Sequence, residues 1–369
     1  MEDATRKLSS RILIKSPNWI GDIVLSIPAI KALRGIYPDS YIAVLVKQEL
    51  VDLLVNNPAI NEVIPYEEGH GLKKFSMILH LRDIIRKGDF DTALLFTNSF
   101  SSALIAFLAG VPDRVGYNKD GRGLLLTNPI KVKDENKSIH QTCIYLNLIN
   151  CMEFQNRDSS VTLFLQNDNT VILSEAKNLI PEIHIKEKDR EWAVNLVKEK
   201  IKKGKYLIGI NPGARYGAAK RWLAERFVEL GNRLTLKFNA SIILFGGPEE
   251  KEFVSGIAAG IKTQQGDVLN MAGSTSLGQL AALIERCDVF ITNDTGPMHI
   301  AYSVGTPVVA IFGSTDPNRT GPLGDSHKIV KKNIPCSPCF KRVCPFDMEC
   351  MKMIEVEDVM NAVKSLIRD

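Results

Sequence analysis

The chain has 369 residues, of which 45% are hydrophobic and 24% charged, and its formal net charge is +4. At this length we expect two domains, and the composition is typical of a soluble globular protein. The small positive charge suits phosphorylated small molecules or an anionic surface, and it argues against a protein dedicated to nucleic acids.

The sequence shows no sign of a membrane-spanning segment or a signal peptide. No apolar run approaches the roughly 20 residues that cross a bilayer. The start of the chain is mostly polar or charged, which does not fit a secretory leader. We therefore expect a cytoplasmic protein, with peripheral contact at a membrane surface as a further option.

Short β-branched runs alternate with amphipathic helical runs along the first half of the chain. We predict buried strands at 12–15, 41–46, 62–65 and 92–96. We predict helices at 22–34, 50–56, 72–87 and 101–109. Such alternation produces a parallel sheet with helices on both faces.

A polar stretch from about residue 166 to residue 188 contains Pro181 and no strong periodicity, so we interpret it as a linker. After it we predict strands at 206–210, 241–245, 289–291 and 307–312. The helices predicted there are 223–236, 249–261, 277–287, 296–304 and 355–367. The sequence therefore predicts an α/β protein with two doubly wound, Rossmann-like domains and a cleft between them.

The predicted domain boundaries follow from this pattern. The first domain covers 1–175 and the second covers 187–350, with a cysteine-rich insert at 335–350. Residues 351–369 form a C-terminal helix that we expect to pack back on the first domain.

The segment 289–299 joins a buried strand to a helix through a polar turn. Pro297 lies in the first turn of that helix, where its missing N–H costs little. We expect the N–H groups of Thr295, Gly296 and Met298 to point at one spot, together with the positive end of the helix dipole. This arrangement is typical of a phosphate site.

Two more loops of the second domain follow strands. The loop 211–222 contains Lys220, which can neutralise a phosphate, although a surface lysine on a solvated loop is equally well supported. The loop 245–250 contains Glu249 and Glu250, either of which suits a ribose hydroxyl; acids at a helix start more often serve the helix dipole. Together the three loops indicate sites for phosphate, ribose and phosphate at one edge of the sheet.

In the first domain, the loop 15–22 joins the first strand to the first helix. Gly21 permits close backbone approach to a ligand, and Asp22 stands at the helix start. A carboxylate there can accept a proton from a hydroxyl nucleophile; the alternative is an N-cap aspartate. The loop is not a G-x-G-x-x-G fingerprint, which disfavours a dinucleotide-dependent dehydrogenase.

Four of the seven cysteines lie within fifteen residues of one another, namely Cys336, Cys339, Cys344 and Cys350. Such a tract can hold zinc or an iron–sulfur cluster, but the spacing is not a standard zinc pattern. In a reducing compartment, free thiols are the alternative to ligands. Both readings stay open, and we assign no metal ligand from the sequence.

Through these motifs the chain resembles the ADP-heptose:lipopolysaccharide heptosyltransferases, glycosyltransferase family 9. The resemblance covers nearly the whole chain. It rests on Pro17-Asn18-Trp19-Ile20-Gly21-Asp22, Pro212-Gly213-Ala214, Ala219-Lys220-Arg221-Trp222 and Asn293-Asp294-Thr295-Gly296 with His299. Trp19, the run 220–222 and the segment 98–100 are most like the branch that adds the second heptose of the inner core.

The resemblance implies a GT-B fold and an inverting transfer from ADP-heptose, with no obligatory metal or other cofactor. By the same resemblance, Asp22 takes the place of the general base and Lys220 that of the lysine on the donor phosphates. The other implied donor-binding residues are Glu249 or Glu250 at the ribose, Asp294, Thr295 and Gly296 at the diphosphate and heptose, and His299. His299 either touches the sugar or packs under its helix.

The implied acceptor is a heptosylated Kdo–lipid A at the inner face of the membrane. We expect the first domain to bind it, through Asn98, Ser99, Lys73, Lys74, Arg114 and Arg122. The alternatives within enzymes are a first-heptose transferase, another GT-B nucleotide-sugar transferase or a nucleotide-sugar epimerase. An alternative of another class is a metal- or partner-binding protein on a transferase scaffold.

Overall fold

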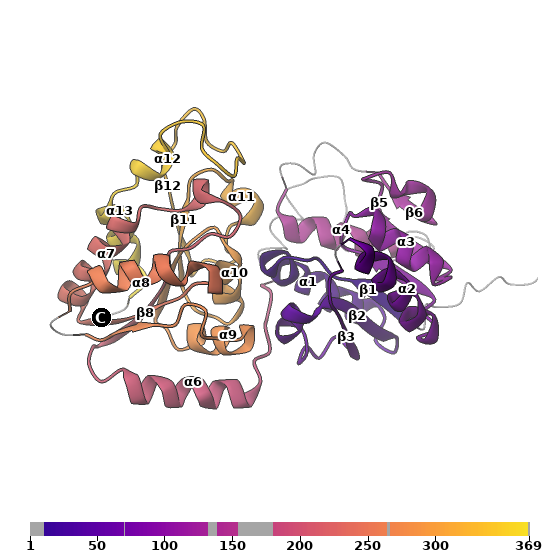
Figure 1. Cartoon of the computed structure of the whole chain (residues 1–369), viewed down its shortest axis with the longest axis horizontal. Coiled ribbons are helices and arrows are strands. Elements are labelled where there is room, and N and C mark those ends of the chain that lie inside the picture. Colours follow the sequence, from indigo (N-terminus) through magenta and orange to yellow (C-terminus); the bar gives the residue numbers. More distant parts are fainter. Residues whose placement is uncertain (1–10, 70, 132–138, 154–179, 264–265, 368–369) are drawn as a thin grey trace, which may run out of the picture. The chain divides into compact units, whose positions relative to one another are not determined.

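The computed structural model describes residues 11–69, 71–131, 139–153, 180–263 and 266–367 (Figure 1). The chain divides into two compact units, Met1–His184 and Ile185–Asp369. The division falls within the linker predicted for 166–188, of which residues 166–179 lie outside the described part.

The first unit contains one six-stranded parallel sheet. Its strands are β1 (Arg11–Lys15), β2 (Tyr41–Lys47), β3 (Glu62–Tyr66), β4 (Thr92–Leu95), β5 (Asp113–Tyr117) and β6 (Asn128–Ile130). Its helices are α1 (Ile20–Ile36), η1 (Gln48–Leu53), α2 (Leu72–Lys87), α3 (Phe100–Leu108), η2 (Arg122–Leu125) and α4 (Gln141–Glu153). The strand order is β3-β2-β1-β4-β5-β6, which is the doubly wound order of a dinucleotide-binding fold.

Both faces of this sheet are covered because its strands are apolar at successive positions. Along β1, Ile12, Leu13 and Ile14 are all at most 1% exposed, although neighbouring side chains point to opposite faces. Leu13 packs with residues of α2 and α3, which lie together on one face. Helices α1 and α4 pack against each other and form the second helical layer.

The second unit repeats this plan. Its strands are β7 (Tyr206–Asn211), β8 (Ala240–Leu244), β9 (Val268–Asn270), β10 (Val289–Asn293), β11 (Val308–Phe312) and β12 (Lys328–Lys331). Its helices are α6 (Glu187–Lys200), η4 (Ala218–Lys220), α7 (Ala224–Phe238), η5 (Pro248–Glu250), α8 (Lys251–Gly260), α9 (Leu277–Glu285), α10 (Gly296–Ser303), α11 (Pro317–Thr320), α12 (Glu349–Lys352) and α13 (Val356–Lys364). The sheet is parallel, in the order β12-β11-β10-β7-β8-β9.

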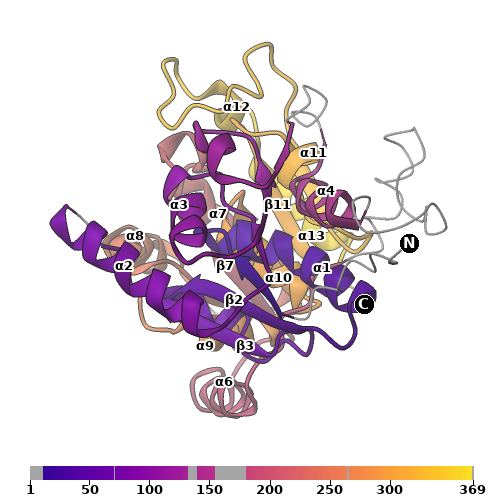
Figure 2. The same cartoon turned by 90° about the vertical axis from the view of Figure 1, so that its right-hand side faces the viewer.

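Helix α6 lies along the outside of the second unit, at the bottom of the views in Figures 1 and 2. It packs on α9, where Arg190 forms a bidentate ion pair with Glu285, with nitrogen–oxygen distances of 2.9 and 3.0 Å. Helices α7, α8 and α13 form the other helical layer of this unit.

The C-terminal helix is part of the second unit. Helix α13 packs on α7, β11 and β12, and Val359 and Met360 are buried in the core of the second unit. The preceding segment is also fixed there, since the indole N–H of Trp222 donates to the carbonyl of Ile354 over 3.0 Å. Helix α13 therefore buries its apolar face within the second unit, and contact of residues 351–369 with the first domain stays a prediction.

In the part of the chain that the structure describes, none of the helices has the length and apolar character needed to cross a bilayer.

Candidate active site at the carboxyl ends of the strands

Each sheet has one point where the strand order reverses. In the first unit it lies between β1 and β4, and in the second between β7 and β10. Ligands of doubly wound sheets bind beyond the carboxyl ends of the strands at such a point. The loops that leave these four strands carry most of the residues singled out by the sequence.

In the second unit, a buried ion pair joins the loops after β7 and β10. The ammonium of Lys220 lies 2.6 Å from Oδ2 of Asp294, and the two side chains are 14% and 4% exposed. Thr315, after β11, donates its hydroxyl to the same oxygen over 2.7 Å. The ring of Tyr216 lies 4.9 Å from the ammonium. Asp294 thus fixes a cationic group at the reversal point of the sheet.

Asparagine side chains hold the same two loops together. Asn293 donates to the carbonyl oxygens of Pro212 and Gly213 over 2.8 and 3.2 Å, and it accepts from the N–H of Trp222 over 3.1 Å. These bonds satisfy backbone groups that leave the sheet without a strand partner. The loop that carries Lys220 is therefore fixed on both sides of η4.

Helix α10 begins at this edge, with Thr295 at its N-cap. Its first turn differs from the prediction in one donor, because the N–H of Met298 donates to the carbonyl of Thr295 over 3.1 Å. Met298 is therefore not available to a ligand, which leaves Thr295 and Gly296 of the predicted three. His299 is buried, with Nδ1 3.1 Å from the hydroxyl of Tyr302 on the same helix, and its contact with the sugar stays a prediction.

Two neighbouring acids in η5 have different environments. Glu249 is exposed, whereas Glu250 is half-buried and accepts the N–H of Gly247 at Oε2 over 3.0 Å. Among the described residues, Oε1 of Glu250 has no hydrogen-bond partner, and it lies 3.7 Å from Nη2 of Arg221. A Cβ on Gly213 would lie 2.2 Å from that oxygen. Glu250 therefore lies against the β7 loop with one carboxylate oxygen, Oε1, that accepts no hydrogen bond from the described residues. The exposed Glu249 shows no such contact among those residues.

In the first unit, Asp22 lies in the first turn of α1 and is half-buried. Trp19 occupies the N-cap position, so the alternative reading of Asp22 as an N-cap residue is wrong. Burial raises the pKa of Tyr145, in α4, well above its ordinary value of 10.0, and the charge of Asp22 raises it further. The carboxylate therefore stands close to a phenol that keeps its proton.

A buried lysine fixes the loop before α1. Lys15 is 6% exposed, and its ammonium donates to the carbonyl of Ser16 over 2.9 Å and to Oδ1 of Asn18 over 3.3 Å. The hydroxyl of Tyr66 donates to the same Asn18 oxygen over 3.1 Å. The pKa of Lys15 is lowered from 10.5 to about 7, chiefly by burial and also by the charge of Lys47, while the charge of Glu68 opposes the shift.

Comparison with known proteins shows the family to which the chain belongs. The family model described as glycosyltransferase family 9 (heptosyltransferase) matches residues 78–349. The chain belongs to this family.

Relatives within the family cover most of the chain. Lipopolysaccharide heptosyltransferase 2 of Escherichia coli K12 is 30% identical over 322 residues, which are 87% of this chain and 88% of the relative. Lipooligosaccharide heptosyltransferase 2 of Campylobacter jejuni O:2 is 28% identical over 97% of this chain and 99% of its own length. The solved structure of ADP-heptose heptosyltransferase II from E. coli matches with a TM-score of 0.77 and 26% identity, covering 96% of this chain and 98% of that one.

The fold of this family 9 chain is therefore GT-B, as the resemblance implies. A family 9 protein from Veillonella parvula shows the same fold, with a TM-score of 0.79 and 24% identity, covering 97% of each chain.

The loop after β4 brings two of the expected acceptor residues to the reversal point of the first sheet of this family 9 chain, beside the β1 loop. Ser99 is exposed, and its hydroxyl accepts the N–H of Ser102 over 3.4 Å, which caps α3. Asn98 is half-buried, with Oδ1 3.4 Å from Nη2 of Arg122. Both lie at the predicted edge.

The two arginines expected at the acceptor both donate to backbone carbonyl groups of the first unit. Arg122 is fully buried, and its guanidinium donates to the carbonyl oxygens of Tyr117 and Thr97. Arg114 donates to the carbonyl of Leu125 over 2.7 Å. Arg122 is therefore covered by its own unit, which argues against direct contact with the acceptor, whereas Arg114 is half-buried and its role at the acceptor stays a prediction.

The remaining basic residues lie at the start of α2. Lys74 is exposed, and the side chain of Lys73 lies outside the described residues. Thr315 and Asn293 were not predicted as site residues. Asn293 ends the buried strand β10, and Thr315 follows the buried strand β11. A polar side chain at the end of a buried strand is the signal that identified Asp294.

Proposed function

We propose that this family 9 protein transfers heptose from ADP-heptose to the heptose of a lipopolysaccharide inner core, adding the second heptose. The observation that carries this proposal is the Lys220–Asp294 pair at the β7/β10 reversal point, in a chain whose relatives are named heptosyltransferase 2. A fixed cation beside a helix N-terminus suits a diphosphate leaving group.

In the second unit, we assign the donor's diphosphate to Lys220 and to the N–H groups of Thr295 and Gly296. These groups are fixed before the reaction, so they can stabilise negative charge as it develops on the leaving ADP. Glu250 is assigned to the adenosine ribose, since its buried Oε1, which has no hydrogen-bond partner among the described residues, can accept a hydrogen bond from a ribose hydroxyl.

In the first unit, we assign the general base to Asp22. The acceptor hydroxyl oxygen attacks the anomeric carbon as the bond from that carbon to ADP breaks, and the hydroxyl proton passes to Asp22. The product has the opposite anomeric configuration, and no covalent enzyme intermediate forms. Because Asp22 and Lys220 belong to different units, the proposal requires both to meet the same substrate pair during turnover.

We further propose that the first unit meets the inner, cytoplasmic face of the membrane, where a lipid-anchored acceptor would be presented. Helix α2 packs on α3, and α3 packs on η2. Large apolar side chains are exposed on all three, with Phe75 67% exposed, Phe107 46% and Leu124 96%, and Lys74 is exposed beside Phe75. Exposed apolar groups with a neighbouring cation suit an anionic lipid surface.

The function is tested by complementation in a bacterium that lacks its own second-heptose transferase. The proposal predicts that expression of this chain restores one heptose to the core, read by the mass of the isolated lipopolysaccharide. An unchanged core mass, with the protein present and folded, would contradict it.

A further inference from the structure

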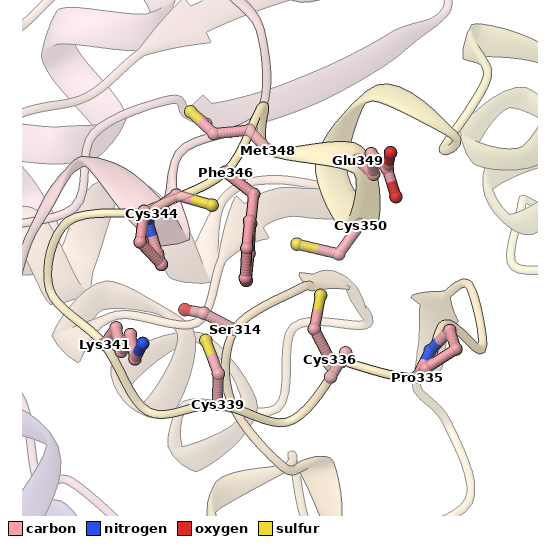
Figure 3. A pocket seen from close by; sticks show the side chains of 13 residues that line it. Ser314, Pro335, Cys336, Cys339, Lys341, Cys344, Phe346, Met348, Glu349 and Cys350 are labelled. Carbon is pink, nitrogen blue, oxygen red and sulfur yellow. The ribbon is translucent and has the colours of Figure 1, made fainter.

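The cysteine tract encloses a cavity that the transfer reaction does not use. The cavity has a volume of about 290 Å³, and all four cysteines of the tract line it. Figure 3 shows the four sulfur atoms pointing into this space. Cys336 and Cys339 lie on one side of it, and Cys344 and Cys350 lie on two other sides. Three segments of the tract therefore present sulfur to one volume.

The walls of this cavity are anchored to the core of the second unit. The N–H groups of Cys339 and Phe340 donate to the carbonyl of Ser314, just after β11, over 3.1 and 2.8 Å. Ser337 donates its hydroxyl to the carbonyl of Gly313 over 2.6 Å. Cys350 is 8% exposed in α12 and belongs to the hydrophobic core. The first CxxC pair and the last cysteine are thus held in place, and the stretch between them bridges the cavity.

The other three cysteines lie away from this cavity. Cys143 and Cys151 belong to α4, and Cys287 follows α9. The cysteines that line the cavity are therefore the four of the tract.

We propose that the four cysteines of the tract bind one thiophilic divalent cation, with zinc(II) as the probe ion. Thiolate is the preferred ligand of such ions, and a CxxC pair supplies two ligands from one turn. Four sulfur–metal bonds form, and the thiol protons that are lost pass to the solvent. The cation takes the place of these protons among the four sulfur atoms.

Binding requires the tract to close on the ion. In the part of the chain that the structure describes, no group of three cysteine, histidine or acidic side chains is already gathered closely enough to hold a metal. The cavity is larger than a single ion needs. We infer that Cys344 is the ligand that moves inward, since it lies in the mostly exposed stretch between the anchored Arg342 and Cys350.

The site has a mechanical connection to the loop that carries Lys220. The N–H of Ala219 donates to the carbonyl of Arg342 over 3.2 Å, and the guanidinium of Arg342 lies 4.9 Å from the ring of Tyr216. A Cβ on Gly217 would lie 2.3 Å from that same carbonyl oxygen, so the two loops are in direct backbone contact. A metal that fixes the tract therefore also fixes the loop that carries Lys220. Any effect on donor binding rests on the proposed function, because it depends on the assignment of Lys220 to the donor.

The test is the metal content of the whole protein, purified without chelator and then dialysed against zinc(II). We expect about one ion per chain, and we expect the chelator-treated protein to take up cobalt(II) with the visible absorption of tetrahedral thiolate coordination. Less than about a tenth of an ion per chain after zinc dialysis, with no such absorption, would overturn the proposal.

Variants locate the ion. The double variant Cys336→Ser/Cys339→Ser should lose at least about nine-tenths of the bound metal, whereas Cys151→Ser should keep it. Metal retained by the double variant would place the ion elsewhere and overturn the assignment. If the double variant fails to fold, cobalt(II) titration of the unaltered chain decides, because it needs no substitution. Neither readout depends on heptose transfer, so failure of the proposed function leaves this result separate.

Discussion

The ammonium of Lys220 and the carboxylate of Asp294, 74 positions apart in the sequence, lie 2.6 Å apart where the order of the second sheet reverses. Asp294 is 4% exposed, and it also accepts from Thr315. Asp294 holds the ammonium of Lys220 in place and partly neutralises its charge. A bound diphosphate would therefore share Lys220 with Asp294.

Replacing Lys220 by Met should weaken ADP binding by about tenfold to a hundredfold, because a charge-assisted contact to phosphate is lost. The same variant leaves the carboxylate of Asp294 without its cation, so the free energy of unfolding should also fall. Calorimetric titration with ADP measures the first effect, and urea unfolding the second. Lys251→Met, at an exposed lysine of the same unit, is the matched control. Equal ADP affinity in the two variants would remove Lys220 from the donor site.

Replacing Asp22 by Asn should reduce kcat on the order of 10²–10⁴-fold, as loss of a general base does. ADP affinity should stay unchanged, since the assigned donor contacts belong to the second unit. Initial-rate measurements of ADP release report kcat, with Asp39→Asn as a control at an exposed aspartate. A variant that keeps near-normal kcat would show that another group takes the proton.

The two neighbouring acids of η5 should differ in their effect on the nucleotide. Glu250→Gln should weaken ADP binding by about tenfold, because a charged acceptor for a ribose hydroxyl becomes neutral. Glu249→Gln, which removes an exposed carboxylate one residue away, should leave the affinity unchanged. With a dideoxy analogue of ADP, the difference between the two variants should vanish. A persistent difference would mean that Glu250 acts on the loop and not on the ribose.

Lys15 should make stability depend on pH. Its pKa is about 7 in the folded chain and 10.5 ordinarily, so between these values the unfolded chain binds more protons. The free energy of unfolding should therefore gain a contribution that rises with pH across this window and is absent below it. Lys15→Met removes that contribution, and urea unfolding at about pH 6.5, 8 and 9.5 compares the slopes. Identical slopes would show that Lys15 keeps an ordinary pKa.

Eight of the twelve described strands could be predicted because most of their residues are apolar at successive positions, as in 12–15 and 206–210. The shorter or more polar strands β5, β6, β9 and β12 were missed. Helix α6, which begins at the end of the predicted linker, was missed because it is strongly polar and buries only Asp189 and Ala193. The segment predicted as a helix at 50–56 is a 3₁₀ helix, Gln48–Leu53. A helix that is strongly polar or very short shows no clear hydrophobic periodicity, so the sequence pattern does not reveal it.

The site could be predicted as a set of loops but not as a set of contacts. The strand-to-helix junctions identified Lys220 and Asp294 separately, and their pairing depends on β7 lying beside β10. Arg122 was expected to face a ligand because sequence does not reveal that an arginine is fully buried against backbone carbonyls. The sequence likewise indicates that α13 has an apolar face, but it does not indicate that this face packs in the second unit.

The most direct test of the account is transfer by the purified protein, with ADP-heptose and a pair of acceptors, Kdo–lipid A with and without its first heptose, read by product mass. The account predicts one heptose added to the monoheptosylated acceptor and none to the bare one. Addition to the bare acceptor, or no product from either while ADP still binds, would contradict it.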